Sequence, residues 1–186
     1  MLHTGTAGFE TGRLICRRFV PDDVAAALRN WAADTMVQYE YGEPVYENTE
    51  KVQKLLGGYI DAYRNDSYYR WAVVEKEIGE CIGQIAFCRV YDDIAAAEIE
   101  YCLGRKFWGR GYASEALSGV IRFAFENTGF RKLEAYHRRA NVRSGRVLEK
   151  SVMHIADNVE RFARMNMVPH DEVCYCITKE EYRSMI

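Results

Sequence analysis

The sequence predicts a single domain of the α/β class, and three observations support this prediction. The chain has 186 residues, which is enough for one well-buried domain and short for two. Runs with the two-residue alternation of strands are interleaved with runs at helical spacing. The sequence has no internal repeats or low-complexity segments, and its three prolines mark no linker. We therefore expect one domain over residues 1–186.

The chain is expected to begin with a strand and two helices. Residues 10–20 have the composition of a strand. Pro21 and the two aspartates after it suit the first turn of a helix, which is expected to reach Trp31. A second helix is expected over residues 49–65.

A hairpin and a further strand follow. The β-rich runs at residues 71–74 and 81–91 are separated by a short polar segment, which predicts a hairpin. Over residues 98–103 apolar side chains alternate with other side chains, a pattern typical of a strand with two unlike faces. Glu98 and Glu100 are therefore expected to point to the same side.

The second half of the chain alternates helices and strands. Apolar residues recur at helical spacing from Tyr112 until Gly129 ends the pattern. Residues 132–137 are expected to form a strand, and a helix follows Asn141, which is a good N-cap. Closing strands are expected at residues 153–156 and 173–178.

The loop between Gly104 and Tyr112 is rich in glycine and basic residues. It reads Arg105-Lys106-Phe107-Trp108-Gly109-Arg110-Gly111. Gly109 and Gly111 allow backbone angles closed to other residues and let a ligand approach the main chain. The first amides of the next helix have no partner within it and lie at the positive end of its dipole. The segment is therefore expected to bind a pyrophosphate.

Two familiar nucleotide-binding patterns do not fit this loop. A dinucleotide fingerprint needs a glycine where Ser114 stands and an acidic residue about 20 positions on, where Glu134 is a poor candidate. The Gly-Lys-Ser/Thr tripeptide of nucleotide hydrolases does not occur in the sequence. An ordinary strand-to-helix turn would be the simpler interpretation of a lone Gly-x-Gly. Here the basic residues of the loop and the helix that starts directly after it favour a ligand.

Composition argues against several other classes. The net charge is −2, with Lys and Arg spread along the sequence rather than gathered in the stripe of a nucleic-acid binder. No apolar stretch approaches the roughly 20 residues of a membrane span, and no signal-peptide core is recognisable, so a cytoplasmic protein is expected. The six cysteines fit neither a zinc site nor a disulfide framework, and His137 and His154 lack partner ligands, so no metal is expected.

Three segments, in the right order, resemble one family. Residues 107–117 are similar to the coenzyme loop of the GNAT superfamily of acetyl-coenzyme A-dependent N-acetyltransferases. Their form, Phe-Trp-Gly-Arg-Gly-Tyr-Ala, resembles that of the branch containing the ribosomal-protein N-terminal acetyltransferases (RimJ/RimL-type). Residues 12–19 resemble the first strand of that branch, and residues 141–150 resemble its second coenzyme-contacting helix.

The resemblance implies a fold and a coenzyme. The fold would be a mixed, mostly antiparallel sheet of six to seven strands, flanked by helices and splayed at the strand that ends near Gly104. Acetyl-coenzyme A (acetyl-CoA) would bind to a core formed by about residues 97–150. The contacting residues would be Cys102, Leu103, Arg105, Trp108, Gly109, Arg110, Gly111, Tyr112, Ala113, Ser114, Asn141 and Ser144.

The implied reaction is direct attack of a neutral amine on the acetyl thioester in a ternary complex, which needs a base and a proton donor. Glu98 is the candidate base, acting through water, and like-charge crowding by Glu100 should raise one carboxyl pKa. The alternative is that both carboxylates simply face solvent. Ser144 resembles the serine that the branch has near the sulfur, whereas Leu148 stands where many GNAT enzymes have a proton-donating tyrosine. Ser144 could instead serve only to cap its helix.

Fewer residues can be assigned to the acceptor pocket than to the coenzyme site. Glu100 stands where the branch commonly has glycine, so it would narrow the acceptor pocket and attract a cation. Tyr175 matches a frequent family tyrosine near the acceptor, although an aromatic residue in a strand is more often part of a core. Val152 stands where the family usually has glycine, and the turn there is expected to differ.

The acceptor implied by the branch is the N-terminal α-amine of a protein or peptide. A small amine such as a polyamine, an amino acid or an aminoglycoside is the alternative, because this superfamily changes acceptor while keeping its coenzyme site. A coenzyme-binding module without turnover and transfer of a longer acyl group also stay open, as does the choice between a monomer and a homodimer. No nucleic-acid or membrane partner is expected.

Overall fold

The fold is built on one eight-stranded sheet. The computed structural model describes residues 1–185, and its strands lie side by side in the order β1-β2-β3-β4-β5-β6-β8-β7. Their bounds are Phe9–Glu10 (β1), Leu14–Arg17 (β2), Tyr69–Glu75 (β3), Glu80–Tyr91 (β4), Ala96–Leu103 (β5), Lys132–Arg138 (β6), His154–Ala156 (β7) and Glu172–Thr178 (β8).

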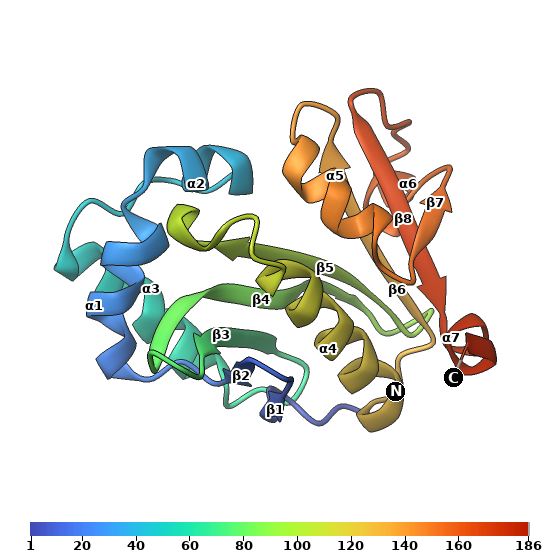
Figure 1. The fold of residues 1–186 in the computed structure, drawn as a ribbon. Coiled ribbons are helices and arrows are strands. Elements are labelled where there is room, and N and C mark those ends of the chain that lie inside the picture. Colours follow the sequence, from blue (N-terminus) through green and yellow to red (C-terminus); the bar gives the residue numbers. More distant parts are fainter. Residues whose placement is uncertain (186) are drawn as a thin grey trace.

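The sheet divides where β5 meets β6. These two strands run parallel and pair only over Ala96 to Glu98 in β5 and Lys132 to Glu134 in β6, whereas the other neighbouring strands are antiparallel. Beyond Glu98, β5 pairs with β4 alone and continues to Leu103, while β6, β8 and α5 diverge from it (Figure 1). The predicted splay is therefore present, and it begins at Glu98.

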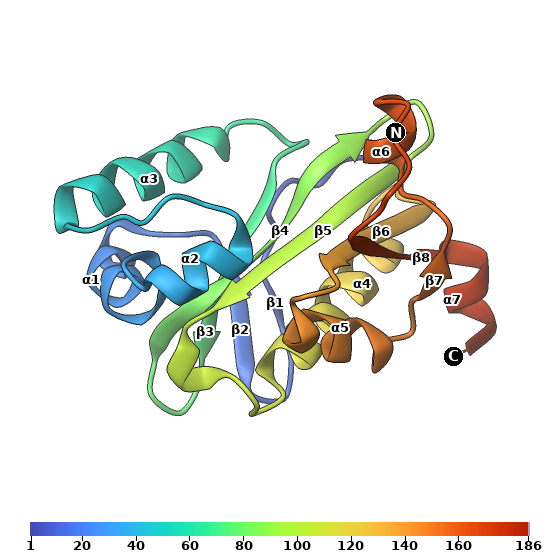
Figure 2. The same ribbon diagram turned by 90° about the horizontal axis from the view of Figure 1, so that it is seen from above.

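Helices cover both faces of the sheet. Their bounds are Pro21–Asp23 (η1), Val24–Ala27 (α1), Leu28–Ala32 (η2), Thr35–Tyr41 (α2), Thr49–Ala62 (α3), Arg105–Phe107 (η3), Tyr112–Asn127 (α4), Val142–Glu149 (α5), Glu160–Arg164 (α6) and Lys179–Met185 (α7). The larger core joins α4 to the sheet through residues such as Leu117 and Trp71. A second core joins α1, α2 and α3 to the other face around Trp31 and Leu56. Figure 2 shows α1–α3 gathered together, apart from α4 and α5.

The first predicted strand differs from the structure. Residues 10–20 form two short strands, because the Thr11 N–H donates to the Leu14 carbonyl and closes a turn between them. Beyond β2 the chain leaves the sheet, and the Phe19 N–H donates to the Tyr63 hydroxyl instead of to a strand. Because of this division the sheet has eight strands, whereas six or seven were expected.

Three helices were not predicted, namely α2, α6 and α7, yet two of them carry recognisable caps. Asp34 accepts hydrogen bonds from the first amides of α2, and Gly42 ends that helix at a φ of +85°. Thr178 and Glu181 exchange hydrogen bonds before α7 in the Ser/Thr-x-x-Glu pattern of a capping box. The helix predicted from Pro21 is an irregular series of short 3-10, α and π segments.

Candidate active site

The loop before α4 has the backbone geometry of an anion site. Gly109 and Gly111 have φ values of +74° and +80°, which disfavour any side chain there. The helix has no side-chain cap, and its first backbone bond runs from the Glu115 N–H to the Gly111 carbonyl. Within the described chain, the N–H groups of residues 112–114 have no protein partner. They are therefore available to phosphate oxygens.

Arg13, in the turn between β1 and β2, makes several contacts with the start of α4. Its Nη2 lies 2.7 Å from Glu115 Oε2, its Nη1 donates to the Arg110 carbonyl at 2.9 Å, and its guanidinium lies 4.4 Å from the centre of the Tyr112 ring. Burial acts to raise the pKa of Glu115, but hydrogen bonds from Thr11 and Arg13 bring it below its ordinary value. Arg13 thus neutralises a carboxylate that would otherwise repel a phosphate, a role that the sequence did not predict.

The basic residues of the loop are only partly free. Arg105 Nε lies 3.1 Å from Asp34 Oδ2, and Lys106 Nζ lies 3.8 Å from Glu80 Oε2. Arg110 is exposed and makes no ion pair within residues 1–185. Of the predicted basic side chains, Arg110 therefore has the least competition for a ligand.

Trp108 joins the end of β5 to α5. Its indole N–H donates to the Leu103 carbonyl at 2.7 Å, and the Arg143 guanidinium lies 4.3 Å from the ring centre. Cys102 is buried, and its thiol lies 3.6 Å from the Gln84 amide nitrogen. A ligand along β5 would thus meet the backbone of Cys102 rather than its thiol.

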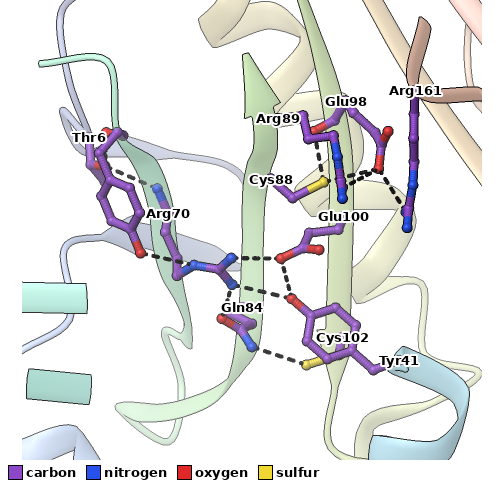
Figure 3. Close-up of polar contacts among 11 residues, drawn as sticks. Thr6, Tyr41, Arg70, Gln84, Cys88, Arg89, Glu98, Glu100, Cys102 and Arg161 are labelled. Carbon is purple, nitrogen blue, oxygen red and sulfur yellow. Dashed lines mark hydrogen bonds and ion pairs between the residues drawn. The ribbon is translucent and has the colours of Figure 1, made fainter. Parts of the chain in front are cut away.

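Glu98 lies where β5 and β6 part, and it is only 2% exposed. Its Oε1 lies 3.3 Å from Cys88 Sγ, 3.4 Å from Arg89 Nη1 and 3.6 Å from Arg161 Nη1 (Figure 3). Its Oε2 is buried and has no hydrogen-bond partner among the described residues. Burial raises the pKa of Glu98, against the opposing effects of Cys88 and the two arginines, and Glu100 adds a smaller rise. Glu98 is therefore not a solvent-facing carboxylate, and its pKa is raised mainly by burial rather than by Glu100.

Glu100 has a different environment. Its Oε1 accepts hydrogen bonds from the Tyr41 hydroxyl at 2.6 Å and from Arg70 Nη2 at 2.7 Å (Figure 3). Arg70 also donates to Gln84 Oε1 at 2.6 Å and to the Tyr68 hydroxyl at 3.1 Å. The cation expected beside Glu100 is thus supplied by the chain itself, and the charge of this carboxylate is already balanced.

Ser144 connects α5 with β5. Its N–H donates to Asn141 Oδ1 at 3.0 Å, so Asn141 caps α5 as predicted. Ser144 Oγ lies 2.9 Å from the Tyr101 hydroxyl. Burial raises the pKa of Tyr101 to about 12, and the hydrogen bond with Ser144 opposes this rise. Tyr101 was not predicted as a site residue, because it occupies a position that the alternation of the strand assigns to apolar side chains.

Tyr175 lies on the sheet face opposite to Glu98. It pairs with Ala135 across β6 and β8, whereas Glu98 pairs with Glu134, the neighbour of Ala135. Successive strand residues point to opposite faces. Tyr175 is 3% exposed and belongs to the larger core. The structure therefore does not bring it to Glu98, and its role toward an acceptor stays a prediction.

The turn at Val152 needs no glycine. Val152 is exposed, and the non-glycine residues with positive φ within residues 1–185 are Ala95 and Asn166. Ser151 builds the turn through its hydroxyl, which donates to the Leu148 carbonyl at 2.6 Å.

Two surface depressions lie away from the predicted site residues. Depressions along α4, lined among others by Gly119 and Arg122, contain none of the predicted catalytic or coenzyme-contacting residues. In the described chain, no group of three or more His, Cys, Asp or Glu side chains is placed to hold a metal ion. None of the helices in residues 1–185 combines the length and apolarity needed to cross a membrane.

Comparison with known proteins identifies the family. Residues 13–154 match the family model of the acetyltransferase (GNAT) domain. The uncharacterized N-acetyltransferase YoaA of Bacillus subtilis (strain 168) is 28% identical over 170 residues, which cover 91% of this chain and 96% of YoaA. A GNAT-family acetyltransferase structure from Bacillus anthracis has a TM-score of 0.75 at 22% identity, covering 94% of this chain and 99% of that chain.

A ribosomal-protein-S5-alanine acetyltransferase structure from Vibrio fischeri also has a TM-score of 0.75, at 16% identity, and covers 94% of this chain and 97% of that chain. At such identities the two structures establish the fold alone. The match over residues 13–154 shows that this chain belongs to the GNAT acetyltransferase family.

Proposed function

We propose that the protein is an acetyl-CoA-dependent N-acetyltransferase of the RimJ/RimL-type branch that acetylates the N-terminal α-amine of a protein or peptide. The observation that carries this proposal is the parting of β5 from β6 directly after Glu98. Strand β5 bears a buried carboxylate at that point and, three residues on, the Tyr101–Ser144 hydrogen bond. The glycine loop and the uncapped start of α4 follow directly.

The residues present fit acetyl-CoA. The free N–H groups of residues 112–114 and the exposed Arg110 suit its pyrophosphate. Beyond Glu98, the β6-facing edge of β5 has no strand partner, so its backbone can pair with the amides of the coenzyme arm. When bound, the coenzyme supplies an activated acetyl thioester. The protein must then remove a proton from the amine and provide one to the departing sulfur.

Glu98 is the proposed base. Its raised pKa brings the carboxylate closer to the pH at which it exchanges protons efficiently. Its unpartnered, buried Oε2 suits a water molecule that could pass the proton from the amine. Oε1 is held by Cys88, Arg89 and Arg161, which fixes the direction in which Oε2 points.

Ser144 is the proposed proton donor. The Asn141 cap fixes the Ser144 backbone, and the Tyr101 hydroxyl fixes the side chain. Leu148, one turn further along α5, is fully buried and has no proton to give. Tyr101 keeps its proton at neutral pH and can replace the one that Ser144 gives up, so we assign it as the positioning partner of Ser144.

The peptide acceptor and the cellular location are the remaining parts of the proposal. The loop form at residues 107–113 is the support for the ribosomal-protein branch. A cytoplasmic location belongs to the same proposal, because the six cysteines are free thiols in the structure.

Mass spectrometry of a mixed acceptor panel tests the proposal. Purified protein and acetyl-CoA are incubated with peptides of varied N-terminal residue, polyamines, amino acids and aminoglycosides, and the acetylated products are identified. Acetylation of peptide α-amines supports the proposal. If only small amines are acetylated, the acceptor is a small amine and not the N-terminus of a peptide. The Glu98→Gln and Ser144→Ala variants should lose turnover and keep coenzyme binding. Coenzyme binding with no turnover of any acceptor would favour a binding module.

A further inference from the structure

Two arginines beside Glu98 have N–H groups that the fold does not use. Arg89 Nη1 and Arg161 Nη1 approach the same oxygen, Glu98 Oε1, at 3.4 Å and 3.6 Å. Both distances exceed the roughly 2.7–2.9 Å of a strong charge-assisted hydrogen bond. Arg161 also donates to the Tyr136 hydroxyl. The remaining N–H groups of the two guanidiniums have no protein partner within residues 1–185.

Both guanidiniums can be reached from solvent. Their side chains are 42% and 31% exposed for Arg89 and Arg161, whereas the Glu98 side chain is 3% exposed. They come from β4 and α6 and converge on Glu98 (Figure 3). A ligand that reaches Glu98 therefore contacts these arginines as well.

Arg70, the third arginine of this region, is not available in the same way. Its donors are used by Glu100, Gln84, Tyr41 and Tyr68, and its side chain is only 12% exposed. Arg70 therefore has a structural role, whereas Arg89 and Arg161 have N–H groups free to bind a ligand.

Nearby acidic groups do not cancel the charge of the pair. Asp93 Oδ2 lies 2.6 Å from Arg164 Nη2, and Asp92 Oδ1 lies 2.8 Å from His3 Nε2. Glu134 is the strand neighbour of Glu98, and its Oε1 lies 2.6 Å from Lys132 Nζ. Two guanidiniums thus share one carboxylate, Glu98. A positive charge here favours the neutral form of an incoming amine and repels a polycation.

We infer that Arg89 and Arg161 bind a carboxylate on the acceptor, so that the preferred acceptor is an amine with a carboxylate close by. The carboxylate could come from an acidic side chain directly after the N-terminal residue of a peptide or from the carboxyl group of a free amino acid. This inference rests on the proposed function, because it takes Glu98 as the group that receives the amine. It disfavours polyamines and aminoglycosides.

The test compares matched peptides that begin Ser-Glu, Ser-Gln and Ser-Lys and are otherwise identical, with free serine and glutamate as separate arms. Hydrogen bonds to charged groups contribute about 1.5–3 kcal/mol, so kcat/KM for Ser-Glu should exceed that for Ser-Gln by at least about tenfold. The Ser-Lys peptide should be poorer still. A higher kcat/KM for the free amino acids than for Ser-Glu would assign the carboxylate to a free amino acid.

Variants separate carboxylate binding from an indirect effect on Glu98. Arg161→Gln and Arg89→Gln should each reduce the Ser-Glu to Ser-Gln preference, chiefly through KM, and Arg161→Glu should turn it toward Ser-Lys. If the arginines act only on Glu98, all peptides change by the same factor and the preference survives, which overturns the inference. Arg164→Gln, one turn further along α6 and paired with Asp93, is the matched control and should keep the preference.

Binding measured without turnover distinguishes this inference from the proposed reaction. Calorimetry with the coenzyme A complex should show tighter binding of Ser-Glu than of Ser-Gln. Selective binding without acetylation upholds the carboxylate site and rejects the reaction. Acetylation with no preference among the peptides upholds the reaction and rejects the carboxylate site.

Discussion

At the scale of single residues, Glu98 is where stability and function conflict. A buried carboxylate oxygen without a partner destabilises the folded state. Such a group is retained where a base is needed, because the same burial that disfavours its charge raises its pKa toward neutrality. The burial and the unpartnered oxygen of Glu98 therefore support its proposed role as the base.

The Glu98→Gln variant should be more stable than the wild type and nearly inactive. With its pKa raised on folding, Glu98 favours the native state only when protonated, and this contribution is lost as the pH rises through its folded-state pKa. Above that pH the neutral amide should raise the free energy of unfolding, and at pH 4 the difference between the two proteins should shrink. Turnover should fall by roughly 100-fold or more. Urea denaturation at pH 4 and pH 8, with acetylation assays, measures both effects.

Glu100→Gln is the control for this prediction. Because Glu100 balances the buried Arg70, its neutral variant should lose stability at pH 8, opposite in sign to Glu98→Gln. If Glu98→Gln were equally destabilised, the carboxylate of Glu98 would be structural.

Ser144→Ala should lower kcat by about 100-fold with little change in coenzyme affinity, because a general acid acts only in the reaction. Tyr101→Phe should reproduce a smaller part of that loss, since it removes only the hydroxyl that holds Ser144 Oγ. Steady-state kinetics and calorimetry with coenzyme A give the two readouts. A wild-type kcat in Ser144→Ala would reject the assignment, and an unchanged kcat in Tyr101→Phe would show that Ser144 needs no partner.

At the scale of elements, the sequence predicted what depends on local signals. The hairpin of β3 and β4, strand β5 and helices α4 and α5 follow from alternation, helical spacing, glycines and the Asn141 cap. Helices α2 and α7 were missed although Asp34 and the Thr178–Glu181 pair mark them, because short helices have weak periodicity. Helix α6 begins at Glu160, and its N-cap residue Val159 provides no side-chain hydrogen bond, so no such signal was available.

The site was predicted less completely, because its decisive features join distant parts of the chain. Arg13 reaches Glu115 across 102 residues. Arg161, on the unpredicted helix α6, sets the environment of Glu98. The Arg70 contact with Glu100 likewise depends on how β3 and β5 are placed. Alternation assigned Glu98 and Glu100 to one face but gave neither burial nor partner.

The glycine loop provides a paired test at this scale. Gly111→Ala places a side chain at a φ of +80°, with its Cβ 3.3 Å from Arg13 Nη2. Gly42→Ala has comparable strain at a φ of +85°, with nothing within 4 Å of the Cβ. Each should lose about 1–2 kcal/mol of stability, the cost of a left-handed conformation. Only Gly111→Ala should also weaken coenzyme A binding, by about tenfold in Kd measured by calorimetry. Equal affinities in the two variants would place the pyrophosphate elsewhere.

At the scale of the whole molecule, the two halves of the sheet are joined by a short strand pairing and by side-chain contacts across the opening. Strands β5 and β6 pair over three residues, and Tyr101 contacts Ser144. Helix α2 is linked to the other half by Arg138 Nη2, which donates to the Tyr39 carbonyl at 2.7 Å, and by the Arg143–Glu40 ion pair at 3.3 Å. Helix α6 is linked to Glu98 through Arg161. A ligand between β5 and α5 would complete the pairing that β5 lacks. The fold thus keeps a strand edge of β5 open where the coenzyme is proposed to bind. This open edge lies inside the sheet rather than at its margin, so it is less accessible to the strands of other molecules.

Coenzyme A should therefore close this opening, and hydrogen exchange followed by mass spectrometry can detect it. At short labelling times, peptides covering residues 99–103 and 112–115 should gain protection, because their amides without protein partners would then donate to the ligand. Peptides from α3, whose amides are already bonded within the helix, should not change at those times. Protection appearing instead at the depressions beside Gly119 and Arg122 would move the coenzyme to the outer side of α4 and would remove the basis on which Glu98 and Ser144 are assigned to the reaction.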